Sequence, residues 1–168
     1  MKINLLMSSL ALSLFVGLTA QAPVVSASGT STADLLVLAE GDNTMAQRTL
    51  GERYALGIEG VTQDLNQAVF WYKKAADKGD TEALQYLGYA YGQGLGVPQD
   101  WVQAHMWFSL VGTASRKKVA PQHKELAERN RKLVETKMTP KQIEEAQALA
   151  SDWMEKHKRP GPVATIQN

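Results

Sequence analysis

The sequence predicts an all-α fold, a short right-handed α/α solenoid of stacked helix pairs closed by a C-terminal pair of capping helices. Three observations carry this prediction: a segment occurs twice, apolar residues recur at helical spacing in both copies, and helix-capping residues stand at matching places. A repeat period of roughly 20–50 residues is typical of stacked structural units. Such stacks mostly provide extended binding surfaces, so the pattern favours a binding protein.

The two copies of the repeated segment are residues 60–76 and 96–112. Their sequences, GVTQDLNQAVFWYKKAA and GVPQDWVQAHMWFSLVG, match at seven positions spaced by 36 residues. Upstream, five further positions match at a spacing of 37, so the first copy contains one inserted residue, Glu59. Insertions are tolerated best in surface turns, and the shift therefore predicts a loop between two helices in each unit.

The first helix of each unit is predicted from apolar residues spaced by four, which share one face of a helix. These residues are Ala46, Leu50 and Tyr54 in the first copy and Ala83, Leu87 and Tyr91 in the second. Gly51 and Gly88 lie inside the helix, where glycine costs about 1 kcal/mol relative to alanine. We expect the partner helix to approach closely there. Gly57 and Gly94 are predicted left-handed caps.

The second helix of each unit is predicted to open at an aspartate. Asp64 and Asp100 are each followed three residues later by a glutamine, Gln67 and Gln103, in the pattern of a capping box. The predicted inward residues are Ala68, Trp71, Tyr72 and Ala75, and in the second copy Ala104, Trp107, Phe108 and Val111. Small and large side chains at alternating places allow helices to interlock.

The remaining segments flank this repeat. Ala33 to Glu40 is predicted to be a short apolar helix that completes or caps the first unit. Pro121 is predicted to open a charged helix, and Thr139 a last helix with an apolar stripe from Ile143 to Trp153. The predicted organisation is a signal peptide in 1–27, a linker and the start of the N-terminal helix in 28–38, repeats in 39–112 with units 40–76 and 77–112, a helical cap in 113–155, and a loose tail in 156–168.

These motifs resemble the Sel1-like repeat family, a relative of the tetratricopeptide repeats. The resemblance covers residues 40–112 and rests on Leu-Gly-x-x-Tyr-x-x-Gly from Leu50 and Leu87, followed by Gly-Val-x-x-Asp from Gly60 and Gly96. The Met138-Thr139-Pro140 segment looks like the tail of many bacterial members. The resemblance implies an α/α solenoid that acts as an adaptor or scaffold, often at membranes or in the cell envelope.

Some cysteine-rich members of this family have been linked to β-lactam binding or hydrolysis, and they depend on disulfides between repeats. This chain contains no cysteine, so we do not carry that activity over. The amino acid pattern predicts no catalytic, metal or cofactor site, because the three histidines have no second ligand at helical spacing and no phosphate loop or nucleophile motif occurs. A cell-wall or β-lactam-related hydrolase with an unrecognised site is the alternative from the enzyme class.

The N-terminus has the pattern of an export signal. Lys2 precedes an apolar run over residues 5–18, which is shorter than the roughly 20 residues of a spanning helix. Small residues follow, and cleavage is predicted between residues 20 and 27. We therefore expect a periplasmic or secreted protein with no stable membrane span after signal removal. An uncleaved N-terminal anchor is the alternative.

Charge is distributed unevenly along the chain. Residues 28–112 contain 5 Lys and Arg and 10 Asp and Glu, whereas residues 113–168 contain 12 and 7. A nearly neutral whole argues against nucleic-acid binding, which favours net positive charge. The acidic and basic halves leave a self-assembling structural protein as a further alternative, beside the simpler interpretation of solvated helix faces.

The most informative candidate residues are those at which the copies differ. Tyr86 and Tyr89 take the places of Thr49 and Glu52, so the scaffold does not require aromatic residues there. Tyrosine is enriched in binding hot spots. In related superhelices the first helix of each unit lines a concave groove, so the candidate partner-binding residues are Tyr86, Tyr89, Glu52, Arg53 and Gln93, with a protein or peptide as the partner. Half-buried packing against the neighbouring unit is the alternative.

Overall fold

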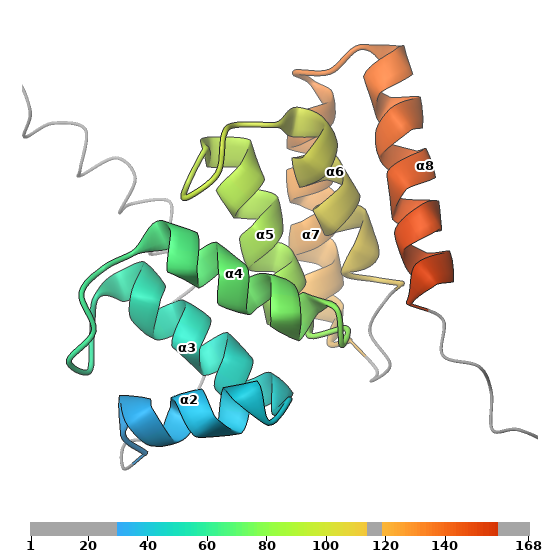
Figure 1. The fold of residues 1–168 in the computed structure, drawn as a ribbon. Helices are drawn as coiled ribbons and strands as arrows, with labels where there is room; N and C mark the ends of the chain where they lie inside the picture. The colour runs from blue at the N-terminus through green and yellow to red at the C-terminus, as the bar shows by residue number, and fades with distance from the viewer. Residues whose placement is uncertain (1–29, 114–118, 158–168) are drawn as a thin grey trace, which may run out of the picture. The chain divides into compact units, whose positions relative to one another are not determined.

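The computed structural model describes residues 30–113 and 119–157, which contain seven α-helices and no β-strand (Figure 1). The helices are α2 (Thr32–Glu40), α3 (Thr44–Leu56), α4 (Leu65–Ala76), α5 (Thr81–Gln93), α6 (Trp101–Leu110), α7 (Pro121–Glu135) and α8 (Pro140–Lys156). The predicted all-α fold of stacked helix pairs is confirmed. The predicted signal peptide, residues 114–118 of the predicted cap and the predicted tail beyond His157 lie outside the described residues.

Two helix pairs, α3 with α4 and α5 with α6, form the repeats, and α4 packs on α5 to join them. In each pair, the same two features shape the loop between the helices: a glycine cap and a backbone hydrogen bond. Gly57 and Gly94 end the first helix in the left-handed conformation, with φ of 66° and 70°. The backbone N–H of Asp64 then donates to the carbonyl of Tyr54, and that of Asp100 to Tyr91, each at 2.9 Å. The loop is thereby fixed to the helix that it follows.

The glycines inside α3 and α5 confirm the predicted close approach of the second helix. A Cβ atom on Gly51 would lie 2.8 Å from the ring of Tyr72, and one on Gly88 would lie 2.6 Å from the ring of Phe108. Both distances are shorter than carbon atoms tolerate. In each unit, one aromatic ring of the second helix therefore packs directly against the backbone of the first helix.

The second helices begin as predicted, but the predicted capping boxes are only half formed. Asp64 accepts hydrogen bonds from the N–H groups of Asn66 and Gln67, and Asp100 accepts one from Gln103. In both cases the backbone N–H of the aspartate itself is already donated to a tyrosine carbonyl, so it is not available to the glutamine side chain. The complete box occurs at α8, between Thr139 and Gln142.

Helix α2 is the second helix of an incomplete unit that precedes the repeats. At a spacing of 37 its buried residues Leu35 and Ala39 correspond to Tyr72 and Ala76 of α4, which are buried too. The same spacing would place its N-cap at position 27, but the N-cap is Ser31 and the helix begins late. The inserted Glu59 extends the loop to this shortened helix, because its carbonyl accepts a 3.0 Å hydrogen bond from Thr32 Oγ1.

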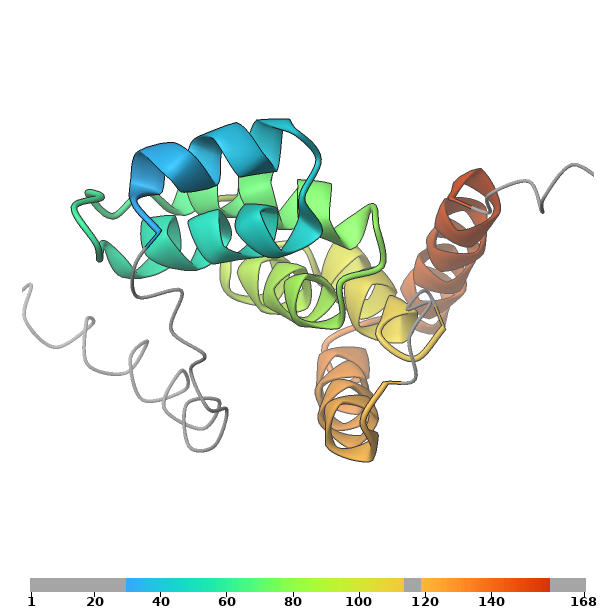
Figure 2. The ribbon, with the colours of Figure 1, turned by 90° about the horizontal axis from the view of Figure 1, so that it is seen from below.

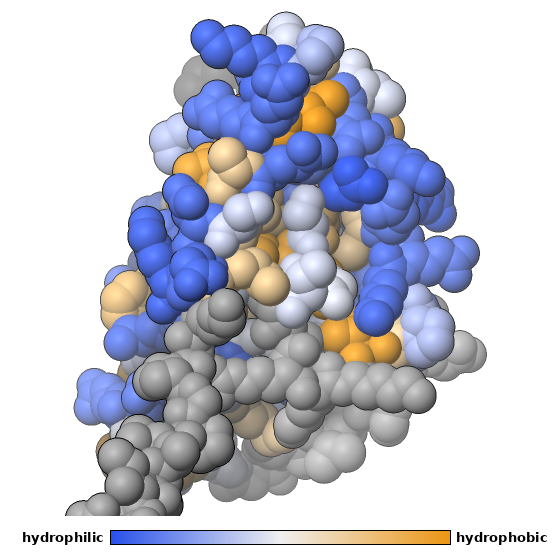
Figure 3. Space-filling model, turned by 90° about the vertical axis from the view of Figure 1, so that its right-hand side faces the viewer, coloured by the Kyte–Doolittle hydropathy of each residue, from blue (hydrophilic) through white to orange (hydrophobic). Residues whose placement is uncertain are grey.

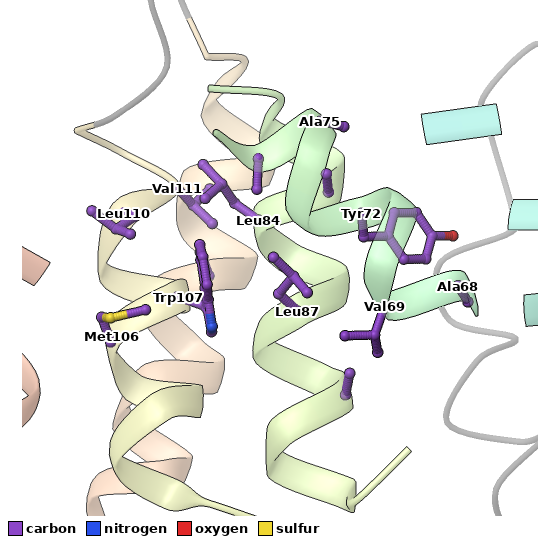
Figure 4. Packing of buried hydrophobic residues seen from close by; sticks show 14 of the residues in the cluster. Ala68, Val69, Tyr72, Ala75, Leu84, Leu87, Met106, Trp107, Leu110 and Val111 are labelled. Atoms are coloured by element: carbon purple, nitrogen blue, oxygen red, sulfur yellow. The ribbon is translucent and has the colours of Figure 1, made fainter. Parts of the chain in front are cut away.

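The core lies between the two units and extends to the capping helices α7 and α8. Its largest members are contributed by α4, α5 and α6 (Figure 4), and they include Tyr72, Leu84, Leu87, Met106, Trp107, Leu110 and Val111. A second cluster packs Trp71 against α2 and α3, and a third packs Phe108 against Val134 of α7. The aromatic repeat positions Trp71 and Trp107 are both 6% exposed, which confirms their predicted packing role.

The two C-terminal helices cap the last repeat, but they are not a packed hairpin. Each packs on α6, from a different side, and they diverge from one another (Figure 2). Helix α8 runs to Lys156, which the sequence placed in the tail, and His157 caps it. Hydrophilic residues predominate on the surface of this end (Figure 3), as expected for the cap of a repeat stack. None of the seven described helices is long and apolar enough to cross a membrane.

Candidate partner-binding face

A cluster of charged side chains joins the first helices of the two repeats. Arg48 of α3 contacts Glu52 on its own helix at 3.0 Å, Asp80 at the N-cap of α5 at 3.5 Å, and Glu82 in the first turn of α5. Three carboxylates thus share one guanidinium group. The formal charge of the cluster is 1 − 3 = −2, so the surface keeps an excess of negative charge.

The electrostatics of this cluster follow from its partial burial. Burial raises the pKa of the Glu52 carboxyl, and the nearby Glu82 and Asp80 charges raise it further, while Arg48 acts in the opposite direction. Burial is also the main reason why the pKa of Asp80 is raised. The attraction of the single arginine therefore does not fully offset the free-energy cost of removing these ionised carboxylates from water. An incoming positive group would lower the free energy of these carboxylates.

An aromatic stack lies beside the charged cluster. The ring of Tyr86 stacks on Tyr72 with 4.4 Å between centroids and 11° between planes. Tyr86 is only partly buried, and burial followed by the charge of Glu52 raises the pKa of its hydroxyl. We call the surface formed by Arg48, Glu52, Asp80, Glu82 and Tyr86 the α3–α5 face. It combines excess negative charge with a partly buried tyrosine ring.

The structure brings only part of the predicted residue set to this face. Glu52 and Tyr86 lie together on it. Tyr89 and the exposed Gln93 continue the same stripe along α5, but the Tyr89 hydroxyl accepts a 2.6 Å hydrogen bond from Asn130 of α7. Arg53 is 5% exposed and donates to Thr32 Oγ1 at 2.7 Å, so it faces α2 instead.

Sequence reasoning missed Arg48 and Glu82. The signal was present, because Arg48 corresponds to Gln85 at the repeat spacing of 37 and the two copies therefore differ there. Both side chains contact the N-terminal part of a later helix, Arg48 through an ion pair and Gln85 through a hydrogen bond. Arg48 reaches the N-terminus of α5, and Gln85 Nε2 donates to the His123 carbonyl in the first turn of α7 at 3.0 Å. This repeat position thus links α3 to α5 in the first copy and α5 to α7 in the second.

A second polar cluster, between α6 and α7, contains the residue types of a hydrolytic triad. His105 Nε2 donates to Glu135 at 2.9 Å, and Ser109 Oγ lies 3.4 Å from His105 Nδ1. However, the serine hydroxyl donates to the His105 carbonyl at 2.8 Å, and the histidine is fully buried. An activated nucleophile needs a shorter contact with its base and access to substrate. This cluster instead ties α7 to the last repeat.

The geometry defines a class of protein: a short stack of α-helical repeats whose ordered helix pairs present a charged and aromatic face. Within the described residues no group of three His, Asp or Glu side chains converges in a way that could hold a metal ion. The arrangement suits recognition of another macromolecule, in which surface shape and charge provide specificity.

The repeats themselves are identified by comparison with known families. Residues 44–80 and 81–110 match the family model of the Sel1 repeat, so this chain carries two Sel1 repeats and the predicted resemblance is confirmed. Sel1 repeats commonly mediate protein–protein interactions. The matched ranges correspond to α3 with α4 and α5 with α6, the two pairs described above.

Individual relatives agree with this assignment. The chain is 34% identical over 58 residues to the ERAD-associated E3 ubiquitin-protein ligase component HRD3A of Arabidopsis thaliana, a match that covers 34% of this chain and 9% of that protein. Among solved structures it resembles c5321, a protective antigen present in uropathogenic Escherichia coli strains that displays an SLR fold. That match has a TM-score of 0.66 and 30% identity, and it covers 82% of this chain and 30% of the other.

A Sel1 repeat protein from Oxalobacter formigenes is also similar, with 23% identity, a TM-score of 0.47, and coverage of 72% of this chain and 53% of that one. The match to this chain spans only 9% of the length of HRD3A and 30% of the length of c5321. What these longer proteins do as wholes is not transferred to this chain.

Proposed function

We propose that this protein is a non-catalytic, exported adaptor that binds a protein or peptide partner in the cell envelope through the α3–α5 face. The observation that carries the proposal is the location of this face. It lies on the first helices of the two Sel1 repeats, and its residues Glu52, Glu82 and Tyr86 stand at positions where the copies differ, so the repeat scaffold does not dictate these three side chains.

The charge of the face indicates the chemistry of its partner. Three carboxylates surround one guanidinium, and Tyr86 adds an aromatic surface next to them. A lysine or arginine side chain could pair with Glu82, which is 40% exposed, and lie against the tyrosine ring. We therefore infer that the bound segment is basic.

The proposed location in the envelope is supported by the amino acid pattern of residues 1–27. A basic start, an apolar run and small residues are the three parts of a secretory signal. Cell fractionation followed by N-terminal sequencing of the mature protein tests this directly. We expect an N-terminus between residues 20 and 27, whereas an intact N-terminus in the cytoplasm would contradict the proposal.

The test of binding uses the mature protein as bait in envelope extract under gentle crosslinking. We expect the Glu82→Lys variant to lose the captured partner, because it places a positive charge where a basic segment would bind. The matched control is Glu144→Lys, the same substitution at an exposed position of α8, which should capture as well as the unaltered protein. Equal capture by both variants would exclude the α3–α5 face.

A further inference from the structure

Helix α5 carries a line of side chains that the rest of the fold does not fully bury. Glu82, Tyr86, Tyr89 and Gln93 are spaced by 4, 3 and 4 residues, so they lie on one side of the helix. The seven buried residues of α5 all lie off this line. We call these four residues the α5 stripe. Its first two members belong to the α3–α5 face, so the stripe continues that face toward the C-terminal end of α5.

The second half of the stripe borders α7, the first helix of the cap. Asn130 Nδ2 donates to the Tyr89 hydroxyl at 2.6 Å. The helices α3, α5 and α7 follow one another along one side of the molecule (Figure 2). Helix α7 therefore borders the stripe at Tyr89, as α3 borders it at Glu82 through Arg48.

A positive charge lies at the border with α7. Arg129 is exposed, and among the described residues the cations of α7 that form ion pairs are Arg131 and Lys132, not Arg129. Burial raises the pKa of the Tyr89 hydroxyl, and the Asn130 hydrogen bond and the Arg129 charge oppose this shift. The guanidinium group of Arg129 is therefore close enough to act on the Tyr89 hydroxyl.

This border has the chemistry of a carboxylate site. A tyrosine hydroxyl that accepts one hydrogen bond still has its own O–H to donate, and a guanidinium group has several N–H donors. Hydrogen bonds from a guanidinium group to a carboxylate are charge-assisted and stronger than those between neutral groups. Leu133, one helical turn after Arg129, is 64% exposed and adds an apolar surface beside these donors.

We propose that α7 extends the α3–α5 face, and that the bound segment carries an acidic residue for Arg129 and Tyr89 as well as a basic residue for Glu82. This inference rests on the proposed function and specifies the chemistry of the partner. The cap thus takes part in binding, because it supplies the positive charge at one end of the α5 stripe.

The distance between the two ends of the stripe sets the spacing of the charges in the partner. Glu82 and Tyr89 are seven residues apart on α5, which is about 10 Å at the rise of an α-helix. An extended peptide covers this distance with about three residues. We therefore expect an extended segment in which Lys or Arg stands about three residues from Asp or Glu.

Selection of binders from a displayed library of short random peptides, with the purified protein as the target, tests this proposal. We expect the enriched peptides to carry the two opposite charges at that spacing. Arg129→Glu should weaken the binding of an enriched peptide about three- to tenfold, because it reverses one solvated charge pair. A second peptide, in which lysine replaces the acidic residue, should bind Arg129→Glu better than it binds the unaltered protein, which a misfolded variant would not do.

The matched control is Lys124→Glu, the same charge reversal at an exposed position on another side of α7, and it should bind the enriched peptide as well as the unaltered protein does. Enriched peptides that are only basic, or that bind Arg129→Glu undiminished while Glu82→Lys weakens them, would overturn the role of α7 and leave the α3–α5 face in place. No enrichment, or enrichment that Glu82→Lys does not affect, would contradict the proposed function itself and this inference with it.

Discussion

At the scale of single residues, the identities between the two copies are explained by packing. Gly51 and Gly88 are shared by the two repeats because Tyr72 and Phe108 occupy the space of a side chain. This contact could be predicted from the sequence, since a glycine inside a helix needs a reason. The contact of Arg48 with the next unit could not, because a long flexible side chain reaches several places from one backbone position.

Substitution of the two glycines of α5 separates packing from helix propensity. Gly88→Ala places a Cβ 2.6 Å from the Phe108 ring, so we expect it to destabilise the protein by about 1–3 kcal/mol despite the gain in propensity. Gly92→Ala, whose nearest neighbour is 3.7 Å away, is the control and should be neutral or stabilising by up to about 1 kcal/mol. Urea unfolding measures both, and equal effects would contradict this account.

At the scale of elements, the order and nature of the helices were predictable and their mutual packing was less so. Caps and apolar spacing identify a helix locally, which is why α3 to α6 begin and end close to where the sequence indicates. The arrangement of α7 and α8 was not predictable, because an amphipathic stripe shows that a helix is covered on one side but does not name the helix that covers it. Their common contact is α6.

The half-formed capping boxes lead to a prediction about α6. Asp100→Ala removes the side-chain acceptor of the Gln103 N–H and should lower the free energy of unfolding by about 1 kcal/mol. Gln103→Ala should cost clearly less, because the backbone N–H that the glutamine would need is donated to Tyr91. Thermal melts of the two variants provide the comparison. Equal losses in the two variants would contradict this account, because they would show that the Gln103 side chain contributes to the cap as much as Asp100 does.

At the scale of the whole molecule, two Sel1 repeats are extended by a half-unit before them and by two helices after them. The described residues 119–157 contain 7 basic and 7 acidic residues, so the basic excess predicted for the C-terminal half is carried by five residues outside the described parts: Arg116, Lys117, Lys118, Lys158 and Arg159. The asymmetry therefore does not reside in α7 or α8. The α3–α5 face, by contrast, lies within the described residues and brings three carboxylates to one arginine.

The most direct test of the central claim is site-specific photo-crosslinking in living cells, with the reactive residue in place of Glu82. We expect a discrete adduct with another protein, because position 82 lies on the α3–α5 face and is accessible. The same residue in place of the exposed Gln67 of α4, or of the exposed Gln147 of α8, should give no such adduct. An adduct from either control position but not from position 82 would contradict the proposed binding face.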